Sequence, residues 1–159
     1  SKSRSRLLES VMKEVVFDIE ADNLLPGITK IHCLSYLEVG SKLVGTLYDQ
    51  QEIEQFFSHD YLYIGHHIVG YDFKALNKIY DIKRPKYFLD TLAWSWYLFP
   101  DRAEHGLESW GEDFGVPKPK IDDWQNLTIE EYAHRCEEDV KINTKLYQLV
   151  KTKMKEIYS

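Results

Sequence analysis

Runs of apolar residues, separated by turn-forming residues, divide this sequence into predicted strands and helices. The runs that predict strands are residues 15–20, 31–37, 42–48, 61–65 and 87–89. The second and third runs are joined around Gly40-Ser41, which is typical of a tight turn. We therefore expect the first three strands to be consecutive and antiparallel.

Apolar residues at helical spacing alternate with the later strands. Helices are predicted from position 49 or 50 to 57, over 71–80, after the capping pair Asp90-Thr91, and over 107–114. Thr128-Ile129-Glu130-Glu131 has the form of a capping box, which predicts the start of a long helix. Its predicted inward stripe comprises Ile129, Tyr132, Cys136, Val140, Tyr147, Val150 and Met154. This order indicates an α/β fold with a mixed sheet of about five strands flanked by helices.

Length and composition fit one domain, because 159 residues with 43% hydrophobic content suffice for a core. We expect a flexible N-terminal arm over residues 1–13 and a single domain over 14–159. Cys33 and Cys136 form no CxxC motif, which favours a reducing cytoplasm over a disulfide framework or a zinc site. The sequence has no apolar run of the ~20 residues that span a bilayer, so no membrane partner is expected.

The formal net charge of -6 argues against a broad basic surface that grips nucleic acid. It does not exclude a nuclease, because metal-binding carboxylates contribute negative charge that ions neutralise. Local basic groups at 83–86 and at Lys118 and Lys120 have two interpretations, phosphate contacts or solvated loops. We favour solvated loops.

Two carboxylates lie on one face of the first predicted strand. Strand side chains alternate, so Asp18 and Glu20 point the same way while Phe17 and Ile19 point to the opposite layer. Like charges at the centre of a sheet repel unless a cation lies between them. The alternative is an edge strand with a solvated acidic face, but the apolar residues before Asp18 favour a metal site.

Two further acids are placed to join this pair. Asp72 follows the fourth strand, where it has the alternative role of a first-turn helix acid. Asp139 lies on the buried stripe of the long helix, where an unpaired carboxylate is costly unless it binds a cation. These four acids, from three segments, could hold two divalent ions about 3.5–4 Å apart, and oxygen ligands favour Mg²⁺ or Mn²⁺. His134 is the candidate general base, with an ordinary surface histidine as the alternative.

Three motifs resemble those of the DEDD, or DnaQ-like, 3′–5′ exonucleases, and in particular the proofreading domains of phage Pol I-type DNA polymerases. The motifs are Phe17-Asp18-Ile19-Glu20-Ala21, the segment 65–72 that ends in Tyr71-Asp72, and Arg135-Cys136-Glu137-Glu138-Asp139-Val140. The intervening segments at 90–92 and 105–110 also match. His67 departs from the second motif, where the family tends to carry asparagine. The resemblance covers roughly residues 14 to 150.

The resemblance implies an RNase H-like fold and a cofactor of two Mg²⁺ or Mn²⁺ ions. The implied metal ligands are Asp18, Glu20, Asp72 and Asp139. It also implies that nucleotides are removed from a 3′ end, and that the segment from Ala21 to Leu25 contacts the terminal nucleotide. Leu24 or Leu25 would press against the base, and the implied substrate contacts also include His67, Tyr71 and Arg135. Asp90 would be a structural helix cap.

The third motif divides the family by the residue that precedes its aspartate. One branch has tyrosine four residues before it, where this chain has Arg135, which keeps its charge. The other branch has histidine five residues before it, which is the place of His134. Five residues on one helix turn through about 140°, so His134 and Asp139 share a face only if the helix starts late or is distorted. We favour His134 as the general base. The alternative is that Arg135 contacts a phosphate of the substrate.

The function we expect is a two-metal-ion 3′–5′ exodeoxyribonuclease that acts on single-stranded or frayed DNA ends in proofreading or end trimming. A DNA polymerase or another replication partner would hold the substrate, and a phage-encoded enzyme would work in the host cytoplasm. A 3′–5′ exoribonuclease is the nearest alternative, since no residue is identified that contacts the 2′-hydroxyl. The alternative from another class is a non-catalytic nucleic-acid-binding module of the same fold.

Overall fold

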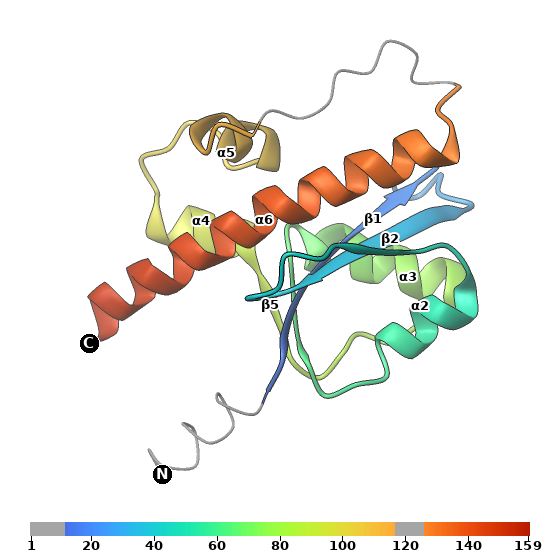
Figure 1. Ribbon diagram of the computed structural model, residues 1–159, viewed down its shortest axis with the longest axis horizontal. Coiled ribbons are helices and arrows are strands. Elements are labelled where there is room, and N and C mark those ends of the chain that lie inside the picture. The colour runs from blue at the N-terminus through green and yellow to red at the C-terminus, as the bar shows by residue number, and fades with distance from the viewer. Residues whose placement is uncertain (1–11, 117–125) are drawn as a thin grey trace.

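The computed structural model describes residues 12–116 and 126–159 (Figure 1). The elements in chain order are β1 (Glu14–Ala21), β2 (Ile31–Glu38), β3 (Gly45–Leu47), α2 (Gln50–Phe56), β4 (Leu62–Gly65), the π-helical turn η1 (Ile68–Asp72), α3 (Phe73–Tyr80), β5 (Phe88–Asp90), α4 (Thr91–Leu98), α5 (Leu107–Asp113) and α6 (Ile129–Tyr158). The predicted arm lies almost wholly outside the described residues, as do Lys118 and Lys120. None of the described helices combines the length and the apolarity needed to cross a membrane.

The five strands form one mixed sheet in the order β3-β2-β1-β4-β5. β1 pairs antiparallel with β2 and parallel with β4, and β5 continues the parallel half. This confirms the predicted α/β fold, with the first strand at the centre. β3 is shorter than the predicted 42–48, because only residues 45–47 pair with β2 and no other strand within residues 12–116 and 126–159 pairs with this edge strand.

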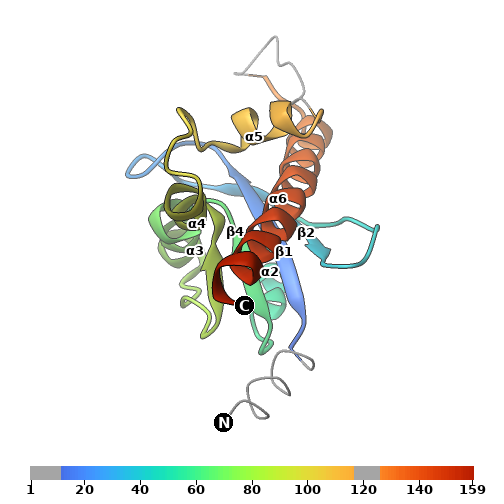
Figure 2. The same ribbon diagram turned by 90° about the vertical axis from the view of Figure 1, so that its left-hand side faces the viewer.

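Helices cover both faces of the sheet (Figures 1 and 2). Because strand side chains alternate, Phe17 and Ile19 of β1 enter one core, which α2 and α3 complete with Ile53 and Leu76. On the other face Val16 packs with Val140 and Tyr147 of α6. The two acids of β1 share the α6 face with Val16, so they lie under the long helix.

Helix α6 begins where the sequence predicts. The Thr128 hydroxyl accepts a hydrogen bond from the Glu131 amide, and the Glu131 carboxylate accepts one from the Thr128 amide. Beyond the sheet, α4 and α5 pack along α6 through Leu98, Trp110 and Leu146. Ile129 is 44% exposed, so its predicted inward orientation is wrong. At the first turn the helix has not yet reached the core, and Tyr132 makes the first ring contact, with His32.

The helix predicted over 71–80 has a different start. The chain first forms η1, whose left-handed N-cap is His67 with φ 63°, and α3 begins only at Phe73. π-helical turns are rare and are frequent at functional sites. Asp72 is the last residue of this turn and is buried.

Candidate metal centre

Three carboxylates meet between β1 and α6. Asp18, Glu20 and Asp139 each offer one oxygen, and these three oxygens lie within 4.8 Å of one another. A hydrogen bond from a side chain of α6 to the backbone of β1 supports this arrangement, because the Cys136 thiol donates to the Asp18 carbonyl oxygen at 3.1 Å. The strand pairing of β1 with β2 also becomes irregular between Glu20 and Ala21, which is the kind of bulge found beside active sites.

Asp72 contributes a fourth acid from η1. Its side chain is only 3% exposed, and its Oδ2 atom has no hydrogen-bond partner in the described part of the chain. Burial raises the pKa of this carboxyl well above its usual range, although a hydrogen bond from the Ile19 amide opposes the shift. A buried carboxylate oxygen left without a donor is costly, and a divalent cation satisfies it. The oxygen donors present therefore fit Mg²⁺ or Mn²⁺.

Asp90 fixes the turn that carries Asp72. Its carboxylate accepts hydrogen bonds from the backbone amides of His67 at 2.8 Å, Val69 at 3.1 Å and Leu92 at 2.9 Å. The predicted helix cap is confirmed by the Leu92 contact, whereas the contacts with the His67 and Val69 amides were not predicted. A Cβ at Gly70 would lie 2.4 Å from the His67 ring, so any larger residue there would displace that ring.

A cavity of about 450 Å³ opens over the acids. It is lined by Asp18, Ile19, Glu20, Leu24, Leu25, His66, His67, Gly70, Tyr71, Asp72, Leu107 and Asp139. It thus brings together the four predicted acids and four of the predicted substrate residues, which are Leu24, Leu25, His67 and Tyr71. The other predicted site residues, Ala21, His134 and Arg135, are not part of this lining.

The segment after β1 is held in shape by Asp22. Its carboxylate accepts hydrogen bonds from the amides of Thr29 at 2.9 Å and Lys30 at 3.1 Å, and from the Thr29 hydroxyl, which lower the pKa of Asp22 to about 2. The Tyr71 hydroxyl donates to the Asn23 carbonyl at 2.8 Å. Leu24 between these contacts is 73% exposed, so it projects from a fixed loop beside the cavity.

His134 and Arg135 lie on different sides of α6. The helix is continuous from Ile129, so it neither starts late nor breaks near 134. His134 is exposed, whereas the Arg135 side chain is 17% exposed and its Nε lies 4.0 Å from Glu20 Oε1. The structure therefore brings Arg135 beside the acids and places His134 outside the cavity lining.

The hydrogen-bond partners of His66 were not predicted from the sequence. The His66 Nδ1 lies 2.9 Å from the Thr91 hydroxyl, and the His66 Nε2 donates to the His105 carbonyl oxygen at 2.7 Å. Asn143 of α6 donates to the same Thr91 hydroxyl at 2.8 Å. This buried group joins β4, α4 and α6 behind the acids. The sequence signal that could have indicated these contacts is the polar residue at the start of α4, Thr91, and the one at an inward position of α6, Asn143.

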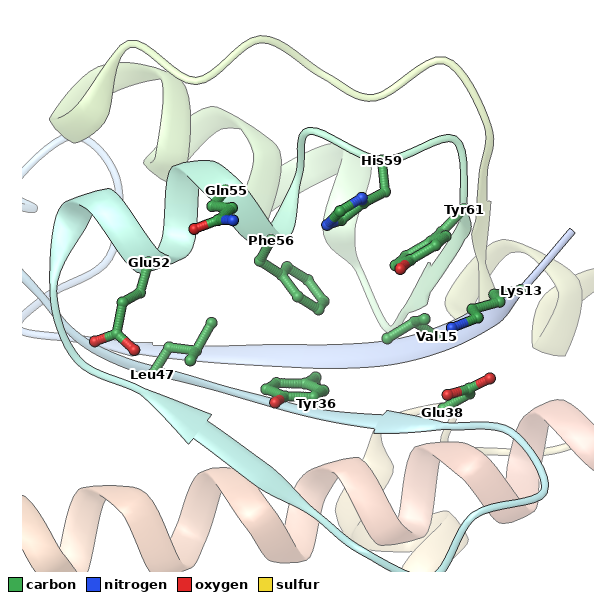
Figure 3. A pocket seen from close by; sticks show the side chains of 10 residues that line it. All are labelled: Lys13, Val15, Tyr36, Glu38, Leu47, Glu52, Gln55, Phe56, His59 and Tyr61. Carbon is green, nitrogen blue, oxygen red and sulfur yellow. The ribbon is translucent and has the colours of Figure 1, made fainter.

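A second cavity, of about 310 Å³, lies on the opposite face of the sheet (Figure 3). Its aromatic lining comes from the sheet and from the α2 side, with Tyr36 facing Phe56, and the His59 ring stacked on Tyr61. Glu52 and Glu38 stand toward its two ends. Because β1 side chains alternate, this cavity is separated from the acids by the sheet itself.

A mixed five-stranded sheet of this order, with helices on both faces, is the fold of RNase H-like exonucleases. Brucella melitensis NrnC superposes with a TM-score of 0.71 at 14% identity, covering 92% of this chain and 75% of that chain. Escherichia coli RNase D, an exoribonuclease involved in structured RNA processing, gives 0.68 at 12% identity, covering 98% and 44%. E. coli Exonuclease I in complex with a dT13 oligonucleotide gives 0.67 at 13% identity, covering 92% and 42%. NrnC also has solved structures with bound Mg²⁺ and with pGG.

Sequence comparison adds little to this structural likeness. No family model matches the chain. Two proteins described as endolytic peptidoglycan transglycosylase RlpA, from Rickettsia typhi and Rickettsia prowazekii, are 42% identical over 62 and 59 residues. The matches cover 39% and 37% of this chain, and 19% and 18% of those proteins. The chain thus matches about a fifth of the length of these relatives.

Proposed function

We propose that this chain is a metal-dependent 3′–5′ exonuclease of the DEDD superfamily. The observation that carries the proposal is the convergence of Asp18, Glu20 and Asp139 within 4.8 Å, beside a cavity that Asp72 also lines. The fold shared with known nucleases, one of them with bound Mg²⁺, supports it. Acids brought together at this density oppose folding unless a cation neutralises them, which favours an enzyme over a non-catalytic module.

The proposed cofactor is two Mg²⁺ or Mn²⁺ ions held by the four acids. When bound, such ions polarise the scissile phosphate and stabilise the charge on the leaving 3′ oxygen. Water forms the new bond to phosphorus, the bond from phosphorus to the 3′ oxygen breaks, and that oxygen takes up a proton. The products are a nucleoside 5′-monophosphate and a strand shortened by one nucleotide.

The substrate contacts that we propose come from the rim of the cavity. Leu24 and Leu25 would press against the terminal base from the loop that Asp22 fixes, and Tyr71 and His67 would contact the strand. Ala21 belongs to the same segment at the end of β1. These roles are predictions from the resemblance, and their placement on the cavity, Ala21 excepted, supports them.

We propose DNA as the substrate, with RNA as the alternative. The proteins that share the fold differ in this respect, since one is an exoribonuclease and another is bound to a dT13 oligonucleotide. A proofreading role, a phage origin, a polymerase partner, a cytoplasmic location and a single domain over 14–159 stay predictions that rest on the sequence.

Oligonucleotides of DNA and RNA labelled at the 5′ end, incubated with Mn²⁺, test the activity and the sugar preference together. We expect a ladder that shortens from the 3′ end on DNA and, in Asp18→Ala, a loss of about 10³-fold or more in rate, because an ion ligand is gone. Asp60→Asn is the matched control, because Asp60 is exposed and does not line the cavity. An unchanged rate in Asp18→Ala, or products shortened from the 5′ end, would contradict the proposal.

The general base needs a separate test. If His134 is the base, His134→Ala lowers kcat by about 10²–10⁴-fold. If Arg135 is a phosphate contact, Arg135→Ala mainly raises KM, since a charge-assisted contact to the substrate is lost. Steady-state kinetics of both variants across pH separate the roles. Wild-type kcat in His134→Ala would remove that residue from the mechanism.

A further inference from the structure

The Arg135 guanidinium lies beside the acids of the metal centre. Arg135 precedes Asp139 by one helical turn, so both side chains leave α6 on the side that faces β1. The Arg135 Nε lies 4.0 Å from Glu20 Oε1, with the two side chains 17% and 15% exposed. By contrast, the exposed pair between Lys141 and Glu138 leaves the lysine side chain 49% exposed. The Arg135 contact is thus shielded from solvent, where an ion pair is screened less.

The helix around Arg135 is fixed against the sheet by contacts from its neighbours. The Thr46 hydroxyl of β3 donates to Glu137 Oε1 at 2.8 Å, and the Cys136 thiol donates to the Asp18 carbonyl oxygen. One turn earlier, the Tyr132 ring stacks on His32 with centroids 4.1 Å apart. Arg135 therefore approaches Glu20 from a backbone that three side-chain contacts hold in place.

The charge of Arg135 acts on the same carboxylate that a divalent ion would need. A guanidinium stays protonated at any physiological pH, so its charge at this position is permanent. It attracts Glu20 and repels a second cation that approaches Glu20, Asp18 and Asp139.

We propose that Arg135 is a resident cation of the metal centre, which neutralises Glu20 in the ion-free protein and competes with a divalent ion for it. Arg135 thereby raises the ion concentration at which the centre fills. It also stabilises the assembled acids before an ion arrives. This inference rests on the proposed function insofar as that function requires an ion at these acids.

Calorimetric titration with Mn²⁺ tests the proposal without any substrate. A unit positive charge about 4 Å from a partly buried ligand repels an arriving cation, so we expect Arg135→Gln to bind Mn²⁺ about tenfold or more tightly than the wild type. Arg135→Met, which keeps the aliphatic stem, should show the same gain if the glutamine variant folds poorly. Arg135→Lys keeps the charge and should stay within about threefold of the wild type.

Lys141→Gln is the matched control, because it removes a cation from the same helix that pairs with Glu138 instead of Glu20. Its Mn²⁺ affinity should stay within about twofold of the wild type, since an exposed charge is screened. Unchanged or weaker Mn²⁺ binding in both Arg135→Gln and Arg135→Met overturns the proposal, and so does an equal gain in Lys141→Gln. If the Arg135 variants bind Mn²⁺ more tightly and no protein shortens an oligonucleotide, the resident cation stands and the exonuclease proposal fails. If the protein shortens an oligonucleotide but the Arg135 variants show no gain in Mn²⁺ affinity, the exonuclease proposal stands and the resident-cation proposal fails.

Discussion

At the scale of single residues, the burial of Asp72 destabilises the ion-free protein. The carboxyl group is almost fully buried, its Oδ2 atom has no donor among the described residues, and burial raises its pKa. In the ion-free protein the charged form of Asp72 therefore opposes folding. Strain of this kind is common at functional sites, where activity and stability make opposite demands.

We predict that Asp72→Asn stabilises the ion-free protein at neutral pH by roughly 1–2 kcal/mol. The sign follows from the raised pKa, because the folded state binds the proton more tightly than the unfolded chain. The stabilisation that protonation provides is complete below the unfolded pKa and is lost as pH rises through the higher folded pKa. The gain in Asp72→Asn should therefore be largest above that folded value.

Urea denaturation with EDTA, from pH 3 to pH 8, measures this difference. The control is Asp81→Asn, since Asp81 is exposed at the left-handed C-cap of α3, a conformation that asparagine tolerates. A gain in Asp72→Asn that persists unchanged at pH 3, or an equal gain in Asp81→Asn, would show that the carboxyl charge is not the cause.

At the scale of elements, Asp90 joins the end of β5 to the turn after β4. Its carboxylate holds the amides of His67, Val69 and Leu92, so one side chain fixes both η1 and the start of α4. Since η1 ends in Asp72, we expect this clamp to position the fourth acid. Its function extends beyond the helix cap that the sequence predicts.

We predict that Asp90→Ala destabilises the protein by about 2 kcal/mol or more, because three amide donors lose a charged acceptor. Asp90→Asn keeps one acceptor oxygen, which receives the His67 and Leu92 amides, and should cost less. Thermal unfolding measures both. If the clamp positions Asp72, Asp90→Ala also weakens Mn²⁺ binding under conditions where it is fully folded. Equal unfolding temperatures for the two variants would contradict this account.

At the scale of the whole molecule, a net charge of -6 is combined with a proposed polyanionic substrate. Few phosphates can be neutralised by a chain with this balance, so binding to single strands should be weak and the salt dependence shallow. Weak binding of this kind favours low processivity, with brief contacts between the protein and the end of a strand.

We predict that log K falls against log [NaCl] with a slope of magnitude below about 3 for a labelled single strand, since only a few counterions are released. Fluorescence anisotropy at several NaCl concentrations, with EDTA present to prevent hydrolysis, measures it. Tight binding with a steep slope would indicate a basic surface of the isolated chain and would weaken the case for a partner that holds the substrate.

The order of the elements could be predicted from the sequence, because periodicity and turn residues are local properties. The capping box at Thr128 and the cap at Asp90 illustrate this, since each depends on residues within three positions. The placement of Asp18 and Glu20 on one face also followed from strand geometry alone. The edge strand β3 and the exposed Ile129 were less predictable, because pairing and burial at the edges of a fold depend on whether a partner is present.

By itself, the sequence determined that four acids exist on three segments, two of them on the first strand, and that three of its motifs resemble those of 3′–5′ exonucleases. The tertiary structure decided which of the neighbouring residues 134 and 135 approaches them. One continuous helix carries both, and a rotation of about 100° per residue directs Arg135 toward Glu20 and leaves His134 exposed. That direction depends on how α6 rests on the sheet, through contacts with residues more than ninety positions earlier in the chain, such as the one between Thr46 of β3 and Glu137. Local patterns carry no information about such contacts, which is why only the fold shows that a positive charge lies beside the acidic centre.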